Sequence, residues 1–201
     1  MFTGRVISMS GSGKKFRLVT QSDFDGLVCA VLLKELDLID DIKFVHPKDM
    51  QDGTILISEN DIITNLPYVP GVHLAFDHHS SEISRLEDSP ENHIIEDNAS
   101  SAARVVYNYY GCKERFANIS KEMIDACDKG NSAQYTIDEI LNPTGWVQMN
   151  YLMDSLTGLG RFREFRVSNY QLMMQLIDFC RDHTIDDILA LPDVHERVEL
   201  Y

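Results

Sequence analysis

Short apolar runs separated by polar turns fill the first half of the chain. Five of these runs are typical of buried strands: FRLVT (16–20), IKFVH (42–46), TILIS (54–58), HLAF (73–76) and HIIE (93–96). GLVCAVLLKEL (26–36) lies between the first two runs, and its wide apolar face predicts a helix. Strand, helix and strand in this order form one βαβ unit, which favours a mainly parallel sheet with helices on both faces.

The second half of the chain has apolar residues at helical spacing. Helices are expected in SSAARVVYNYYG (100–111), SKEMIDACDKG (120–130) and VSNYQLMMQLIDFCRDH (167–183). A further helix is expected in TIDDILALP (184–192), where Thr184 is the N-cap and an acid follows three residues later. We therefore predict the α/β class, with a mainly parallel sheet flanked by helices on both faces and a helical C-terminal part.

The composition indicates one acidic globular unit. The chain has 201 residues, 44% of them hydrophobic, and its 32 acids against 18 bases give a formal charge of −14. This charge repels a long polyanion, so a phosphate-containing substrate needs a local source of positive charge. The four cysteines are scattered, no apolar leader is evident, and no window reaches the ~18 apolar residues of a membrane span. We expect a cytoplasmic protein with reduced thiols and no membrane segment.

Acids and histidines recur where the predicted strands end. Asp23 and Asp25 follow the first strand, and Asp77, His78 and His79 follow HLAF. In open α/β sheets, ligands bind beyond the carboxyl ends of the strands. Neighbouring carboxylates repel unless one takes a proton or a cation lies between them, and the histidines favour a cation such as Mn²⁺, Mg²⁺ or Fe²⁺. Two such ions would activate a water and neutralise phosphate oxygens. Alone, a DxD is commonly a turn or capping pair, and an HH pair commonly lies at the surface.

Four ordered blocks of sequence resemble a known family. TQSDFDGLVCAVLL, FDHHSSE, DNASSAARVVYNYYG and IDACDKG look like the motifs of the DHH phosphoesterase superfamily, named for a triplet found here at 77–79. That superfamily includes RecJ-type exonucleases, nanoRNA and cyclic-dinucleotide phosphodiesterases, family II pyrophosphatases and some exopolyphosphatases. The resemblance spans about residues 16–133, and the tail from Trp146 is more loosely similar to the helical part of the same catalytic domain.

The resemblance implies a role for each matching residue. Its metal ligands would be Asp23, Asp25, His78 and Asp128, with Mn²⁺ as the expected cofactor and Mg²⁺ as the alternative. His79 would face the substrate phosphate, and Asp77 would orient the neighbouring groups.

Arg104 and Ser101 are candidate substrate-binding residues for a separate reason. They lie at a predicted helix N-terminus, where phosphate binding is favourable. Helix capping alone would also explain the serine.

Two positions depart from the family pattern. Gln21 stands near the place of an expected histidine ligand, and Asn65 stands where a bridging aspartate is expected. A neutral amide is a poor bridge between two cations, so we expect one tightly held metal and at most a weak second one. Asp61, four residues before Asn65, is either a substitute bridge or simply a helix or turn acid.

Three functions therefore remain open. A metal-dependent phosphoesterase that hydrolyses a phosphodiester or phosphoanhydride bond ranks first, with a short oligonucleotide, a cyclic dinucleotide, pyrophosphate or polyphosphate as substrate. A weakened regulatory domain that binds a phosphate-containing ligand ranks second, and a plain α/β interaction domain ranks last.

The expected organisation is a flexible N-terminal arm at 1–15 and a single catalytic domain at 16–201, strand-rich over 16–98 and helical over 99–201. No Gly-Gly-Gly-His run, the substrate motif of a second domain in many relatives, occurs in the chain. Either the domain is cut from a longer chain, or substrate selection comes from elsewhere.

Overall fold

The computed structural model describes residues 13–79, 90–154, 158 and 164–200. Most of the predicted arm at 1–15 therefore lies outside the described residues. The first half of the fold consists of β1 (Phe16–Gln21), α1 (Phe24–Glu35), β2 (Ile39–Val45), α2 (Pro47–Gln51), β3 (Asp61–Thr64), β4 (Leu74–Asp77) and β5 (His93–Ile95). The second half consists of α4 (Ala102–Tyr109), α5 (Cys112–Arg115), α6 (Lys121–Asn131), α7 (Ile137–Leu141), α8 (Gly145–Met153), α9 (Asn169–Asp182), α10 (Ile185–Leu189) and α11 (Pro192–Leu200).

The strands form one five-stranded sheet in the order β2-β1-β3-β4-β5, and every pair in it is parallel. The predicted α/β class is confirmed. One prediction within it is wrong: residues 54–58 form no strand, and the strand that pairs with β1 and β4 is β3, a few residues later. Leu56 is 86% exposed, whereas Ile55 and Ile57 are partly buried against the smaller core, so this run packs on the fold without joining the sheet.

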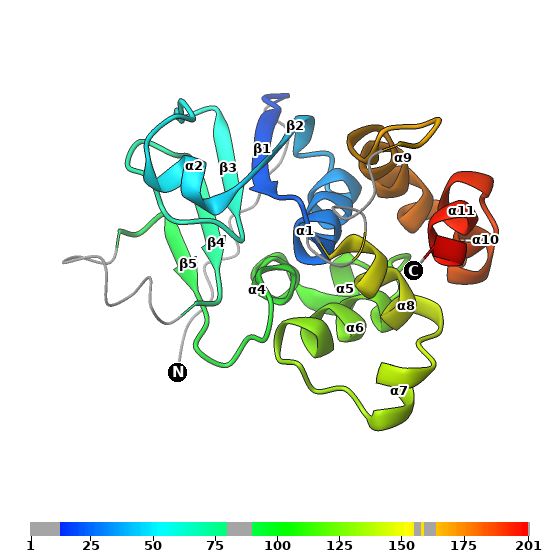
Figure 1. Cartoon of the computed structure of the whole chain (residues 1–201). Helices are drawn as coiled ribbons and strands as arrows, with labels where there is room; N and C mark the ends of the chain where they lie inside the picture. The colour runs from blue at the N-terminus through cyan, green and yellow to red at the C-terminus, as the bar shows by residue number, and fades with distance from the viewer. Residues whose placement is uncertain (1–12, 80–89, 155–157, 159–163, 201) are drawn as a thin grey trace.

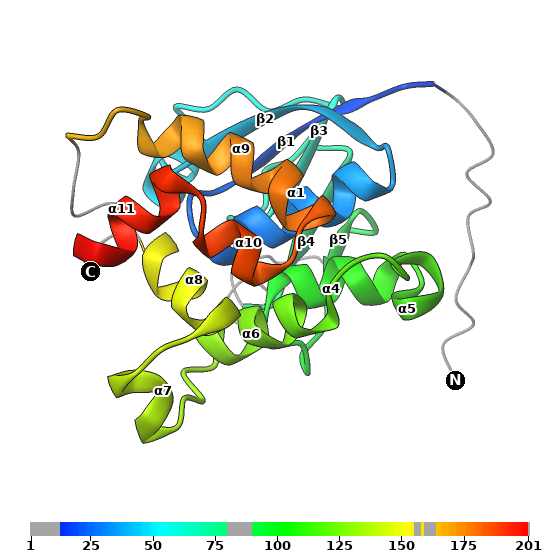
Figure 2. The same ribbon diagram turned by 90° about the vertical axis from the view of Figure 1, so that its right-hand side faces the viewer.

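The two faces of the sheet are covered unequally. The larger core lies against α1, which is buried on all sides because the sheet covers one flank and α4, α6 and α9 pack against the others. A smaller core on the opposite face joins Val19, Val45 and Ile63 to Met50 of α2. Figure 1 shows α2 on one side of the sheet and the long helices on the other, and Figure 2 shows α9 and α10 in front of α1.

Helix ends are fixed by side chains that the sequence makes recognisable. Thr184 caps α10 in a capping box with Asp187, as predicted, and Ser168 caps α9 in the same way with Gln171. No helix in the described part of the chain is long and apolar enough to cross a membrane.

Candidate metal centre

Polar side chains follow three neighbouring strands of the sheet. Asp23 and Asp25 follow β1, Asn65 follows β3, and Asp77 ends β4 immediately before His78. Because these strands are adjacent and parallel, their carboxyl ends lie at the same edge of the sheet. The structure therefore brings the first two predicted motifs together.

The turn after β1 is built around Asp23 and Gly26. Asp23 is the N-cap of α1, and its carboxylate accepts a hydrogen bond from the Gly26 amide at 2.8 Å. A Cβ at position 26 would lie 2.0 Å from the Gln21 carbonyl oxygen, so only glycine allows the helix to start this close to the strand.

Asp25 joins α1 to α4 in the interior. Its side chain is buried, and its two oxygens accept hydrogen bonds from the amides of Ala102 and Ala103 at 2.9 and 2.8 Å. Asn131 of α6 donates to the same carboxylate at 3.3 Å. Burial raises the pKa of the Asp25 carboxyl, and the two amide hydrogen bonds partly offset this rise.

Asp77 holds the end of β4 in place. One of its oxygens accepts the His78 amide at 2.7 Å and lies 2.7 Å from the His79 Nδ1 atom. The His79 side chain is 53% exposed, whereas that of Asp77 is buried. Asp77 therefore orients the half-exposed imidazole that was predicted to face the substrate.

The His78 imidazole points into an acidic cluster formed by Asp23, Asp25 and Asp77. Its Nδ1 atom lies 3.9 Å from an oxygen of Asp25 and 3.9 Å from one of Asp77. This nitrogen is buried and has no hydrogen-bond partner among the described residues. Burial, followed by the charge of His79, lowers the pKa of His78 to about 4, so the ring is neutral at pH 7. A neutral imidazole with a free buried nitrogen is suited to binding a metal.

The acids of the cluster also fit a cation. Burial and the neighbouring Asp25 raise the pKa of Asp23 well above its ordinary value, because two carboxylates are held close together. Asp77, His78 and His79 each offer one ligand atom, and these atoms lie within 4.8 Å of one another. A divalent cation would relieve the repulsion and occupy the free nitrogen of His78.

Asp128, the fourth predicted ligand, is engaged elsewhere. Its carboxylate accepts the Ser101 hydroxyl at 2.6 Å and forms an ion pair with Arg104 at 2.6 Å. The negative charge of Asp128 acts to raise the pKa of His78, so the Asp128 carboxylate lies near the cluster. Its charge is compensated by Arg104.

The two predicted substrate-binding residues are also committed to other partners. Ser101 is fully buried, caps α4 and donates to Asp128, so the structure gives it the capping role rather than a substrate contact. Arg104 is divided between Asp125 and Asp128.

Asn65 interacts with the cluster as a donor. Its side-chain amide donates to both oxygens of Asp23 at 3.2 and 3.0 Å, and its backbone has a left-handed φ of 54°. Asp61, the suggested substitute bridge, lies at the opposite end of β3, where it pairs with Arg17 at 2.7 Å. The prediction that Asp61 bridges two metals in place of Asn65 is therefore wrong.

Three residues around Asp25 were missed at the level of sequence. Asn131 and Cys127 lie one turn apart on α6, and the Cys29 thiol lies 3.7 Å from an Asp25 oxygen. Burial raises the pKa of both thiols, so they remain neutral. Cys29 lies four residues after Asp25 on α1, and Asn131 lies four residues after Cys127 on α6. This i+4 spacing is the sequence signal that could have indicated them.

Comparison with known proteins gives an informative match among solved structures. No protein-family model and no curated protein matches the chain. Among solved structures, the pGpG-specific phosphodiesterase PggH from Vibrio cholerae is similar, with 59% sequence identity and a TM-score of 0.82. The similarity covers 93% of this chain and 60% of that one, so the chain spans about three fifths of the length of its relative.

Proposed function

We propose that this chain is a metal-dependent phosphoesterase domain of the DHH type that hydrolyses a phosphodiester bond in a short nucleotide. The observation that carries the proposal is the Nδ1 atom of the neutral His78 ring, which is buried, has no hydrogen-bond partner among the described residues and lies 3.9 Å from oxygens of Asp25 and Asp77. The 59% identity to a pGpG-specific phosphodiesterase supports the reaction and the class of substrate.

The cation expected here is Mn²⁺, with Mg²⁺ as the alternative, held by Asp23, Asp25, Asp77 and His78. Such an ion lowers the pKa of a bound water and neutralises phosphate oxygens. It also supplies the positive charge that a chain with a formal charge of −14 otherwise lacks. Asp128 is a weaker candidate ligand because the cation would have to compete with Arg104 for its carboxylate.

His79 has a separate part in the proposed reaction. Its half-exposed imidazole is fixed by Asp77 next to the cluster, where it would donate a hydrogen bond to an oxygen of the reacting phosphate. His79 would thus stabilise charge that develops in the transition state, and it would not need to bind the metal.

One tightly held cation fits this centre better than two. The amide of Asn65 donates to both oxygens of Asp23, and an amide nitrogen does not bind a cation. Titration calorimetry should therefore show one tight Mn²⁺ site, and two equally tight sites would contradict the arrangement. The same amide favours the second candidate function, a domain that binds a nucleotide ligand without efficient turnover.

The deciding experiment measures Mn²⁺-dependent hydrolysis of pGpG by the wild-type chain and by His78→Ala. We expect wild-type turnover, with a loss of at least about a hundredfold and loss of bound metal in the variant. Asp25→Asn is the second variant, because asparagine keeps one acceptor oxygen for the start of α4. The matched control is His195→Ala, which removes an exposed histidine of α11.

The two candidate functions give different results. Equal rates for wild type and His78→Ala would end the hydrolase proposal for this substrate. Negligible wild-type turnover at saturating Mn²⁺, with nucleotide binding that weakens in His78→Ala, would establish the binding domain instead.

A further inference from the structure

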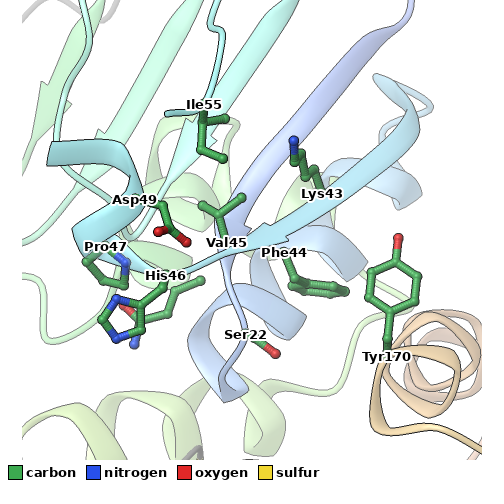
Figure 3. Close-up of a pocket in the computed structure, with 10 residues that line it drawn as sticks. Ser22, Lys43, Phe44, Val45, His46, Pro47, Asp49, Ile55 and Tyr170 are labelled. Carbon is green, nitrogen blue, oxygen red and sulfur yellow. The ribbon is translucent and has the colours of Figure 1, made fainter. Parts of the chain in front are cut away.

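Arg104 is a cation that the fold places beside the proposed metal centre. It lies in the first turn of α4, where the amide of Ala102 donates to Asp25 at 2.9 Å. The pocket of about 480 Å³ in Figure 3 lies instead at the ends of β1 and β2. Its lysine, Lys43, is exposed and forms no ion pair within the part of the chain that the structure describes. Of these two cations, Arg104 is therefore the one whose contacts bear on the centre.

Both oxygens of Asp128 are already engaged, and Arg104 holds one of them. The first oxygen accepts the Ser101 hydroxyl at 2.6 Å. The second lies 2.7 Å from the Nε atom and 2.6 Å from the Nη2 atom of Arg104. The Arg104 and Asp128 side chains are only 20% and 22% exposed, so water and salt screen their attraction weakly. A divalent cation at the centre could gain this carboxylate only by displacing the guanidinium.

Asp128 belongs to the same hydrogen-bonded network as the proposed ligands. Its negative charge acts to raise the pKa of His78. Its partner Ser101 immediately precedes the two α4 amides that donate to Asp25. Asn131, three residues after Asp128 on α6, donates to Asp25 at 3.3 Å. Asp128 therefore lies at the border of the centre, where its carboxylate bears on the binding of a cation.

Arg104 can give up Asp128 without losing every acidic partner. Its Nη2 atom also lies 2.8 Å from an oxygen of Asp125, whose side chain is 46% exposed and pairs with Lys121 as well. A guanidinium can hold two carboxylates at once because its N–H donors form a planar fork. The contact with Asp128 is thus exchangeable, since Asp125 would still compensate the arginine.

We propose that Arg104 sets the affinity of the centre for its cation by competing with that cation for the Asp128 carboxylate. The proposal rests on the proposed function, because it requires a divalent cation held by Asp23, Asp25, Asp77 and His78. While Arg104 holds Asp128, this carboxylate is withheld from the cation. When the guanidinium contacts Asp125 alone, Asp128 is available as a further ligand. Arg104 is therefore a positioning residue for Asp128 and does not itself bind the metal.

The test measures Mn²⁺ affinity by titration calorimetry in a double-mutant cycle. Arg104→Gln should bind Mn²⁺ at least about tenfold more tightly than the wild type, because Asp128 loses its competing partner. In an Asp128→Asn chain the same substitution should change the affinity by less than about twofold. Loss of a positive charge that acts only at long range would instead tighten binding equally in both backgrounds. Arg17→Gln is the matched control, because that arginine pairs with Asp61 at the opposite end of β3, and it should bind Mn²⁺ like the wild type.

Arg104→Lys is the second variant and decides the question if Arg104→Gln does not fold. It keeps the charge, but an ammonium lacks the planar fork, so Mn²⁺ should bind about threefold more tightly than to the wild type. Thermal unfolding without metal reports the structural part of the ion pair. A lower Tm with unchanged Mn²⁺ affinity would make the pair a plain link between α4 and α6 and would overturn the proposal. An equal gain in affinity with and without Asp128 would also overturn it.

Failure of the proposed function gives a different result. A wild type that binds Mn²⁺ without hydrolysing pGpG contradicts the phosphoesterase reaction, and the comparison of affinities still decides the role of Arg104. If the wild type does not bind Mn²⁺, a gain of binding in Arg104→Gln supports the competition. Absence of binding in both proteins contradicts the competition together with the metal centre.

Discussion

Two adjacent histidines at the end of β4 have opposite surroundings. His78 is turned into the acidic cluster, where burial keeps it neutral, whereas His79 is half-exposed and fixed by Asp77. The two rings lie next to each other, with centroids 4.1 Å apart, and differ in burial. One short segment can therefore provide both a metal ligand and a group that meets the substrate.

This difference predicts distinct effects of two alanine substitutions. His79→Ala should leave bound Mn²⁺ nearly intact and lower kcat by about a hundredfold, because the imidazole acts on charge that develops in the transition state. Steady-state kinetics and elemental analysis on the same sample check this expectation. Loss of metal from His79→Ala, in step with the loss from His78→Ala, would make His79 a ligand instead.

The ionisable groups of the centre predict how Mn²⁺ stabilises the fold at different pH. The folded pKa values of Asp23 and Asp25 lie above the ordinary 3.8, so the metal-free protein loses stability as pH rises through them. His78 has the opposite effect: its pKa falls from 6.5 to about 4, so stability rises with pH across that window. Mn²⁺ binds only the deprotonated ligands. The increase in Tm on adding Mn²⁺ should be larger at pH 8 than at pH 5.

Thermal unfolding with and without saturating Mn²⁺ measures this increase directly. His78→Ala is the informative comparison, since it should show little increase at either pH. An equal Tm increase at pH 5 and pH 8 in the wild type would mean that protons do not compete with the ion.

The sequence predicted part of this centre. Asp23, Asp25 and His78 come together because they follow β1 and β4, two parallel strands that flank β3, which a pattern of strands and polar ends can indicate. Asp128 could not be placed in the same way. Its carboxylate pairs with Arg104 of another helix, and that choice of partner depends on how α4 packs against α6.

At the scale of elements, the prediction of the strands failed at β3, where apolar and polar residues do not alternate along the strand. β3 has only four residues, all buried, and its polar ends are satisfied by tertiary contacts. Asp61 pairs with Arg17, and the Thr64 hydroxyl donates to that of Thr20 at 2.8 Å. The apolar run at 54–58 gave a stronger local signal, but it lies outside the sheet.

The connection from β1 to α1 should tolerate no side chain at position 26. A Cβ there would meet the Gln21 carbonyl oxygen at 2.0 Å and the Thr20 hydroxyl at 2.8 Å, and the first of these is backbone. Gly26→Ala should therefore lower the free energy of unfolding by about 3 kcal/mol and weaken Mn²⁺ binding, because the strand and the Asp23 turn must separate. Denaturant unfolding and metal titration measure the two effects.

Gly13→Ala is the matched control for this substitution. It introduces the same methyl group at a position with no heavy atom within 4 Å of the new Cβ, and its backbone has no left-handed φ. Its stability should stay close to that of the wild type. A Gly26→Ala protein as stable as Gly13→Ala would show that the turn can relax.

At the scale of the whole molecule, a local cation and a strongly acidic chain act in opposite directions. The formal charge is −14, so anions are repelled at long range, whereas the proposed metal centre would attract them at short range. A dinucleotide that reacts at the proposed centre would place few phosphates beside the acidic surface. A longer nucleotide must place more of its phosphates beside the acidic surface.

This balance predicts a preference for short substrates that depends on salt. At about 10 mM NaCl, where screening extends over about 30 Å, kcat/KM for pGpG should exceed that for a guanine decamer. At about 150 mM NaCl the screening length falls to about 8 Å, and the ratio should narrow by at least about threefold because the distant phosphates are screened first. The rates are compared at saturating Mn²⁺, with metal content measured at both salt concentrations. A ratio that does not change with salt would mean that the shape of the site, and not the charge of the chain, limits substrate length.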